Sequence, residues 1–136
     1  MKPQHSFVLL LLAITLAACA SAGAPASRVA SFDQEIQLAP GEQVVFGQQA
    51  LQVEFVRVVE DSRCPTDLTC VWAGEVKVQL SIRIGAAAPV QPEITPGQPT
   101  TVDGFRVDVV QVQPERISTR EIAPEEYRVT LKVQQI

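Results

Sequence analysis

Apolar and polar residues alternate along most of the chain after residue 32, and almost no segment has helical spacing. The segment 75–84 is the clearest case, with one apolar face and one polar face. Its apolar positions are Val76, Val78, Leu80, Ile82 and Ile84. A strand of this kind has one side in the core and the other in water, as in antiparallel sheets.

The chain also resembles itself. Residues 51–58 match residues 105–112, and in both segments the alternation is interrupted by two adjacent apolar residues, Phe55-Val56 and Val109-Val110. Such a change of phase predicts a β-bulge. We therefore expect two similar halves of four strands each. In the first half the strands are expected at 34–38, 42–46, 50–60 and 75–84, and in the second at 90–94, 99–102, 105–113 and 126–135.

Turn signals separate these strands. Pro40-Gly41 and Pro96-Gly97 are typical of type II turns, and Asp103-Gly104 is typical of a two-residue hairpin. The sequence thus predicts an all-β fold, an antiparallel β-sandwich of about eight strands, with a partly closed barrel as the alternative.

The first residues have a different character. Lys2 precedes a twelve-residue apolar run, 7–18, which is too short to span a membrane and is typical of a secretory signal. The following Leu16-Ala17-Ala18-Cys19 resembles the lipobox of bacterial lipoprotein precursors. The resemblance implies cleavage after residue 18 and acylation of Cys19, with palmitate among the acyl chains, and hence a membrane anchor.

The expected organisation is a signal peptide over 1–18, an acylated cysteine with a flexible tether over 19–31, and one folded domain over 32–136. The expected location is the bacterial cell envelope. Residue 20 is alanine and not the aspartate that resembles an inner-membrane retention signal, so the outer membrane is favoured if there are two.

Composition narrows the possible functions. The whole chain has a net charge of −4 and loses a further positive charge with Lys2, which argues against a nucleic-acid partner. The single histidine, His5, lies in the predicted signal. The mature protein would therefore lack histidine-dependent catalysis and histidine metal sites. We expect no enzyme activity, no cofactor and no metal.

With Cys19 acylated, Cys64 and Cys70 form an even pair, which in an oxidising compartment indicates a disulfide. A redox couple or a zinc site is a weaker alternative, because the spacing is not that of a reactive dithiol and other ligands are missing. Both cysteines lie in the long connection between the third and fourth strands, and the corresponding connection of the second half, 114–125, has none.

The run DSRCP, four residues, then CVWAGE resembles a recurring segment of an uncharacterised family of small bacterial exported proteins and lipoproteins. The similarity covers roughly residues 32–135. It implies a compartment but supplies no catalytic residues.

The segment 61–74 is the candidate binding loop. Its candidate residues are Asp61, Arg63, Pro65, Asp67, Leu68 and Trp72. Trp72 is expected to cap the end of the core and pack on the disulfide, with an outward-facing binding anchor as the alternative. Asp61, Asp67 and Glu75 are expected to be solvated carboxylates, one of them paired with Arg63, and calcium ligands are the alternative. Tyr127 is expected to have a core or corner role.

We therefore predict a lipid-anchored, non-catalytic protein that presents the loop 61–74 to an envelope protein or ligand. The alternatives are a protease inhibitor, in which Thr66–Thr69 would project as an extended strand, and a structural envelope component, in which the loop would fold back and bury Trp72.

Overall fold

A computed structural model describes residues 27–48 and 51–136 of the chain. These residues form nine strands and one 3-10 turn. The strands are β1 (Arg28–Ala30), β2 (Glu35–Leu38), β3 (Gln43–Phe46), β4 (Leu51–Asp61), β5 (Val76–Ile84), β6 (Glu93–Ile94), β7 (Thr100–Val102), β8 (Phe105–Gln113) and β9 (Arg128–Gln135), and the turn η1 covers Pro124–Glu126. The described part of the chain contains no helix long and apolar enough to cross a membrane.

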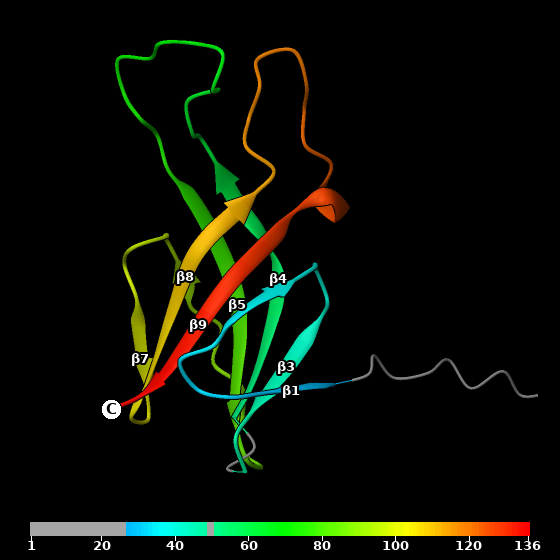
Figure 1. Ribbon diagram of the computed structural model, residues 1–136, viewed down its shortest axis with the longest axis vertical. Coiled ribbons are helices and arrows are strands. Elements are labelled where there is room, and N and C mark those ends of the chain that lie inside the picture. The colour runs from blue at the N-terminus through cyan, green and yellow to red at the C-terminus, as the bar shows by residue number, and fades with distance from the viewer. Residues whose placement is uncertain (1–26, 49–50) are drawn as a thin grey trace, which may run out of the picture.

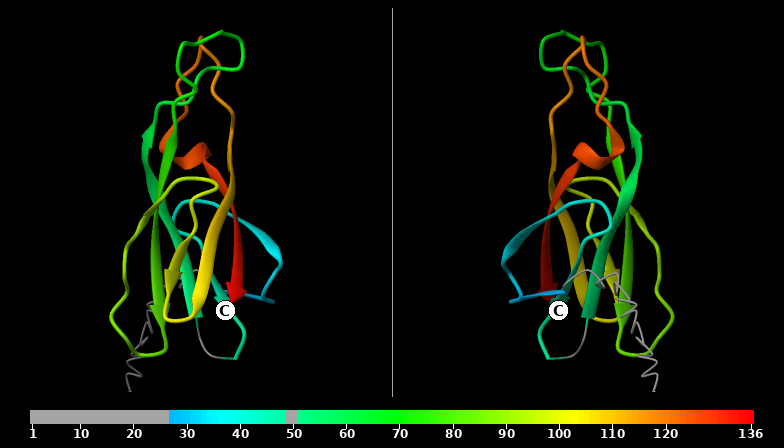
Figure 2. Two further views of the ribbon diagram at one scale, coloured as in Figure 1. Left: turned by 90° about the vertical axis from the view of Figure 1, so that its left-hand side faces the viewer. Right: turned by 90° about the vertical axis from the view of Figure 1, so that its right-hand side faces the viewer.

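The strands form two sheets, in the orders β1-β3-β4-β5-β6 and β2-β9-β8-β7. All neighbours are antiparallel except β1, which runs parallel to β3. The sheets lie as two layers of an elongated molecule (Figures 1 and 2). The predicted β-sandwich is confirmed, and the sheets do not close into a barrel.

The core is the set of inward-facing residues that the alternation predicts. Val76, Val78, Leu80 and Ile82 of β5 are buried, as are Val129, Leu131 and Val133 of β9. All buried side chains among the described residues are hydrophobic or that of Tyr127, which is 9% exposed. The predicted core position of Tyr127 is confirmed.

The two halves share their strand order and the position of one bulge. Strands β3-β4-β5 of the first half and β7-β8-β9 of the second have the same order and directions. The register of β4 against β5 shifts between Phe55 and Arg57, and that of β8 against β9 shifts between Val109 and Gln111. The predicted bulges therefore lie at Val56 and Val110. A second shift, between Val58 and Glu60, occurs only in the first half.

The predicted turns are present as well. Gly41 and Gly97 have φ of +80° and +81°, and each follows the proline of a turn closed by a backbone hydrogen bond between its first and fourth residues. Only glycine adopts this φ without strain, which is why both turns use it. Asp103 and Gly104 both have positive φ, as a type I′ hairpin turn requires.

The halves exchange their first strands. Strand β2 of the first half pairs with β9 of the second, and β6 of the second half pairs with β5 of the first. The register is equivalent, because Leu38 lies opposite Val129 and Ile94 lies opposite Val78, the matching position of the other half. Each four-strand unit of the repeat is thus completed by the other half.

Three boundaries differ from the prediction by more than one residue. Arg28–Ala30, expected in the tether, form β1 and bury Ala30 at the edge of β3, so the folded part begins earlier than residue 32. The strand expected at 90–94 is reduced to Glu93–Ile94 with an isolated bridge from Val90 to Ile82, because prolines remove ladder donors there. The last strand begins at Arg128, since η1 occupies the residues before it. The predicted signal, lipobox and Cys19 lie outside the described residues.

Candidate functional site

The loops that join β4 to β5 and β8 to β9 lie together at one end of the molecule, at the top of Figure 1. We call residues 62–75 the first loop, residues 114–127 the second loop, and the pair the two-loop tip. The first loop continues the β4-β5 hairpin, with hydrogen bonds from Ser62 N to Glu75 O (2.8 Å) and from Cys64 N to Ala73 O (2.9 Å). The tip is therefore an extension of the sheets and not a separate lobe.

The first loop is closed by the disulfide between Cys64 and Cys70, as predicted. Inside this ring the backbone turns, with Leu68 N donating to Pro65 O at 3.1 Å. The residues Thr66–Thr69 therefore form a turn and not the extended strand that the protease-inhibitor alternative requires.

The second loop holds the first from the side. Thr66 donates its backbone N–H (2.8 Å) and its hydroxyl (3.2 Å) to Arg116 O, and Arg116 Nη1 donates to Arg63 O at 2.8 Å. Ser118 donates its backbone N–H to Asp67 Oδ1 (2.8 Å) and its hydroxyl to Asp67 Oδ2 (2.5 Å). The hydrogen bonds from Ser118 lower the pKa of Asp67, so this carboxylate is ionised at neutral pH.

A partly buried ion pair lies at the base of the tip. Arg63 donates from Nε and Nη2 to the two oxygens of Asp61, at 2.7 and 2.6 Å. The same guanidinium reaches across to the other sheet, where it donates to Val112 O and Pro114 O. The Tyr127 hydroxyl donates to Asp61 Oδ2 at 3.0 Å. The predicted pairing of Arg63 with a loop carboxylate is thus confirmed, and its partner is Asp61.

The surroundings fix the protonation of these groups. Burial opposes ionisation of Asp61, but the hydrogen bonds from Arg63 and Tyr127 and the charge of Arg63 together hold its pKa below the ordinary value. Burial and the hydrogen bond to Asp61 raise the pKa of Tyr127 to about 12. At neutral pH the cluster consists of a carboxylate, a guanidinium and a neutral phenol.

Large apolar side chains are exposed at the tip. Trp72 is 82% exposed and Val71 is 93% exposed, and both follow the disulfide directly. Leu68 (53%) and Ile117 (42%) add to this surface. The expectation that Trp72 caps the core is wrong, because the indole is exposed, and Tyr127 is the large aromatic residue buried at that end of the sandwich. The binding-anchor alternative is the one that agrees with the exposure.

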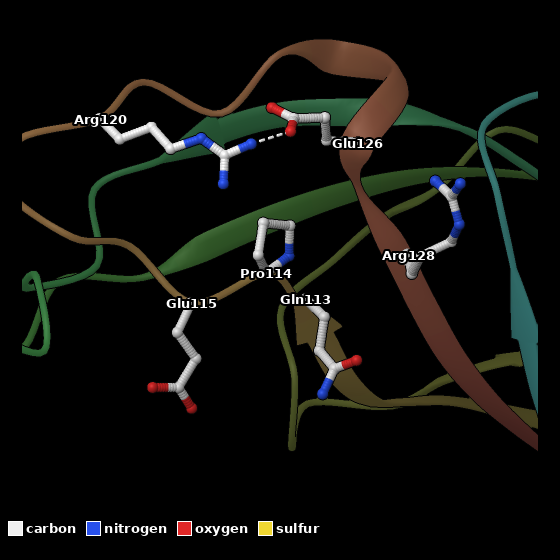
Figure 3. A pocket seen from close by; sticks show the side chains of 6 residues that line it. All are labelled: Gln113, Pro114, Glu115, Arg120, Glu126 and Arg128. Atoms are coloured by element: carbon white, nitrogen blue, oxygen red, sulfur yellow. Dashed lines mark hydrogen bonds and ion pairs between the residues drawn. The ribbon is translucent and has the colours of Figure 1, made fainter.

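A cleft of about 480 Å³ lies beside the second loop (Figure 3). Its lining residues are Gln113, Pro114, Glu115, Arg120, Glu126 and Arg128. Arg120 and Glu126 form an ion pair across it, and Arg128 Nη1 donates to the backbone oxygens of Glu125 and Tyr127. Two arginines and two glutamates leave this cleft with no excess of either charge.

The three carboxylates proposed as calcium ligands do not converge. Asp61 bonds Arg63, Asp67 bonds Ser118, and Glu75 pairs with Lys77 at 3.1 Å. Within residues 27–48 and 51–136 there is no group of three or more acidic, cysteine or histidine side chains that could hold a metal ion. The calcium alternative therefore has no support in the geometry.

Sequence reasoning missed the second loop. Arg116, Ile117 and Ser118 complete the tip, and the internal repeat places their loop at the same end as the first.

No known family model matches this sequence, and comparison with curated proteins and with solved structures gave no match.

Proposed function

We propose that this chain is a non-catalytic binding protein of the bacterial cell envelope, held to a membrane by lipid on Cys19, that presents the two-loop tip to a protein or other envelope ligand. One observation carries the proposal. Val71 and Trp72, two large apolar side chains, are almost fully exposed on a loop that the fold holds rigidly. Exposed apolar clusters of this kind mark interaction sites.

The rigidity of the tip suits binding. The disulfide, the hairpin hydrogen bonds and the contacts from Arg116 and Ser118 order the first loop before any partner arrives. A preordered loop does not lose conformational entropy on association, and affinity improves accordingly. The second loop acts as a brace for the first.

The position of the tip suits a membrane-anchored protein. The described chain begins at Ser27, beside β1 in the lower half of Figure 1, whereas the tip forms the upper end. An anchor attached upstream of Ser27 would leave the tip free.

The two alternatives fit the geometry less well. An inhibitor that enters a protease cleft needs an extended segment, and Thr66–Thr69 form a turn whose Thr66 and Asp67 are bonded to the second loop. A loop that merely closes the sandwich would bury Trp72, which is 82% exposed.

The test is the double substitution Cys64→Ala and Cys70→Ala. Opening this short ring is expected to lower the free energy of unfolding by about 2–3 kcal/mol, so the sandwich still folds. Recovery of envelope proteins that copurify with the detergent-solubilised protein is expected to fall much further than stability does. Leu51→Ala is the control, because Leu51 is fully buried and lies far from the tip. Its truncation is expected to lower the free energy of unfolding by about 2–5 kcal/mol, an amount similar to that of the double variant.

If the double variant recovers its partners at the level of the unsubstituted protein, the tip is not the binding site. If Leu51→Ala loses them equally, the loss reports stability alone.

The anchor is tested separately by Cys19→Ser. The substitution is expected to abolish acylation and to block removal of the signal at that bond, because the cysteine is the acceptor of the lipid. Intact-mass measurement checks both effects. An unsubstituted mature protein without the mass of the acyl groups would refute the lipid anchor.

A further inference from the structure

We propose that Trp72 and the apolar residues around it insert into an apolar pocket of a partner protein, and that the charged residues of the second loop form the rim of that contact. The inference rests on the proposed function and names the class of partner. The partner is a folded protein, and neither a lipid bilayer nor a second copy of this chain.

The exposed apolar residues come from both loops of the tip. Ile117 lies between Arg116 and Ser118, whose contacts bring it beside Thr66 and Asp67 of the first loop. Leu68 follows Asp67, and Val71 and Trp72 follow the second cysteine of the disulfide. From their exposures, these four residues together expose on the order of 500 Å².

The charges around this surface decide between a bilayer and a protein. Bacterial membranes rich in anionic lipid attract clusters of lysine and arginine. The first loop has one charged residue between Pro65 and Gly74, the acidic Asp67. The second loop has Arg116 and Arg120 but four glutamates, so it is acidic overall; the glutamates are Glu115, Glu121, Glu125 and Glu126. An apolar centre containing tryptophan, inside a rim of mixed charge, is the usual composition of a protein–protein interface.

The size of the surface argues against a second copy. Two tips in contact would bury roughly 1,000 Å², which is below the usual range for a stable complex. A partner whose pocket surrounds the tip would also contact the charged rim, and the total buried area would then reach that range.

The test places a photo-reactive amino acid at position 71 of the full-length protein in living cells. The control carries it at position 29, because Val29 is also exposed (79%) but lies on β1, away from the tip. We expect one discrete protein adduct at position 71 that is absent at position 29. The adduct is identified by mass spectrometry and its protein component is purified.

Two measurements then decide the nature of the contact. Calorimetry of the purified component with the detergent-solubilised chain is expected to give at least about 30-fold weaker binding for Trp72→Ala and unchanged binding for Val29→Ala. The lipidated chain is also reconstituted in vesicles of phosphatidylethanolamine and phosphatidylglycerol (3:1). There the emission of Trp72, the only tryptophan, is expected to remain that of a water-exposed indole.

Adducts only with phospholipid, or a blue-shifted Trp72 emission in vesicles, would overturn this inference and leave the tip as a lipid-binding site. An adduct of twice the chain mass would assign the surface to a second copy. Equal affinity for the Trp72→Ala variant would remove Trp72 from the contact. If position 71 cross-links to nothing that position 29 does not, the proposed function fails together with the inference.

Discussion

Gly74 closes the base of the first loop, and its replacement by alanine is the sharpest test of how the tip is built. Gly74 has a φ of +67°, and a Cβ added there would lie 1.8 Å from Ser62 O and 2.5 Å from Ser62 C. Both neighbours are backbone atoms that cannot turn aside, so the hairpin must separate at this point.

The expected cost has two parts. A non-glycine residue in the left-handed region costs about 1–2 kcal/mol. Separation of the strands also removes the hydrogen bonds Ser62 N to Glu75 O and Cys64 N to Ala73 O, each worth about 1 kcal/mol. We expect Gly74→Ala to lower the free energy of unfolding by about 3–4 kcal/mol in total.

Gly97→Ala is the matched control. Gly97 has a φ of +81°, but a Cβ there would meet nothing within 4 Å, so only the backbone cost of about 1–2 kcal/mol remains. Urea unfolding measures both variants, and in thermal unfolding each kcal/mol corresponds to roughly 4 °C. Equal losses for the two variants would refute the reasoning, because they would show that the contact with Ser62 costs nothing.

Two further predictions concern pH. The pKa of Tyr127 is raised from 10.0 to about 12 in the fold, so its contribution to the free energy of unfolding is complete below pH 10 and is lost as pH rises towards 12. Urea unfolding of Tyr127→Phe is expected to show no such loss of stability at alkaline pH. An unchanged loss in the variant would refute the prediction. The pKa of Asp61 is lowered from its ordinary value of 3.8. The contribution of Asp61 to the free energy of unfolding is therefore present above pH 3.8 and is lost as the pH falls below that value. Asp61→Asn is therefore expected to be less stable at pH 7 and to lose less stability on acidification, and an identical acid profile would contradict the ion pair.

The strands and bulges could be predicted because they depend on local pattern. Alternation specifies which residues face the core, and a change of its phase specifies a bulge, as at Val56 and Val110. The second shift, near Val59, was not predicted, although the adjacent apolar pair Val58-Val59 is the same kind of signal; the second half has Gln113 at the position that matches Val59, and it has no second shift.

The partners of the strands could not be predicted in the same way. A pattern says which face is buried but not which strand lies alongside, so the exchange of β2 and β6 between the halves was invisible. Strand β1 was missed because Arg28–Ala30 show no alternation and are ordered by the free edge of β3.

The tip was predictable in location but not in orientation. Its disulfide and the pairing of Arg63 follow from residue type and proximity. Whether Trp72 faces inward depends on which other side chain fills the end of the core. Tyr127, which lies 55 residues later in the sequence, fills it. The bond between Asp67 and Ser118 likewise joins distant segments, and no local rule foretells it.

The exchange of first strands has a consequence for the order in which the chain can fold. The first half can assemble β3, β4 and β5 as soon as it is made, but β2 has no neighbour until β9, the last strand of the chain, arrives. Contacts between segments so far apart in sequence form slowly. The five-stranded sheet can be complete once β6 is made, whereas the four-stranded sheet is completed only when β9 arrives, and a truncation that removes β9 would release β2 near the other terminus as well.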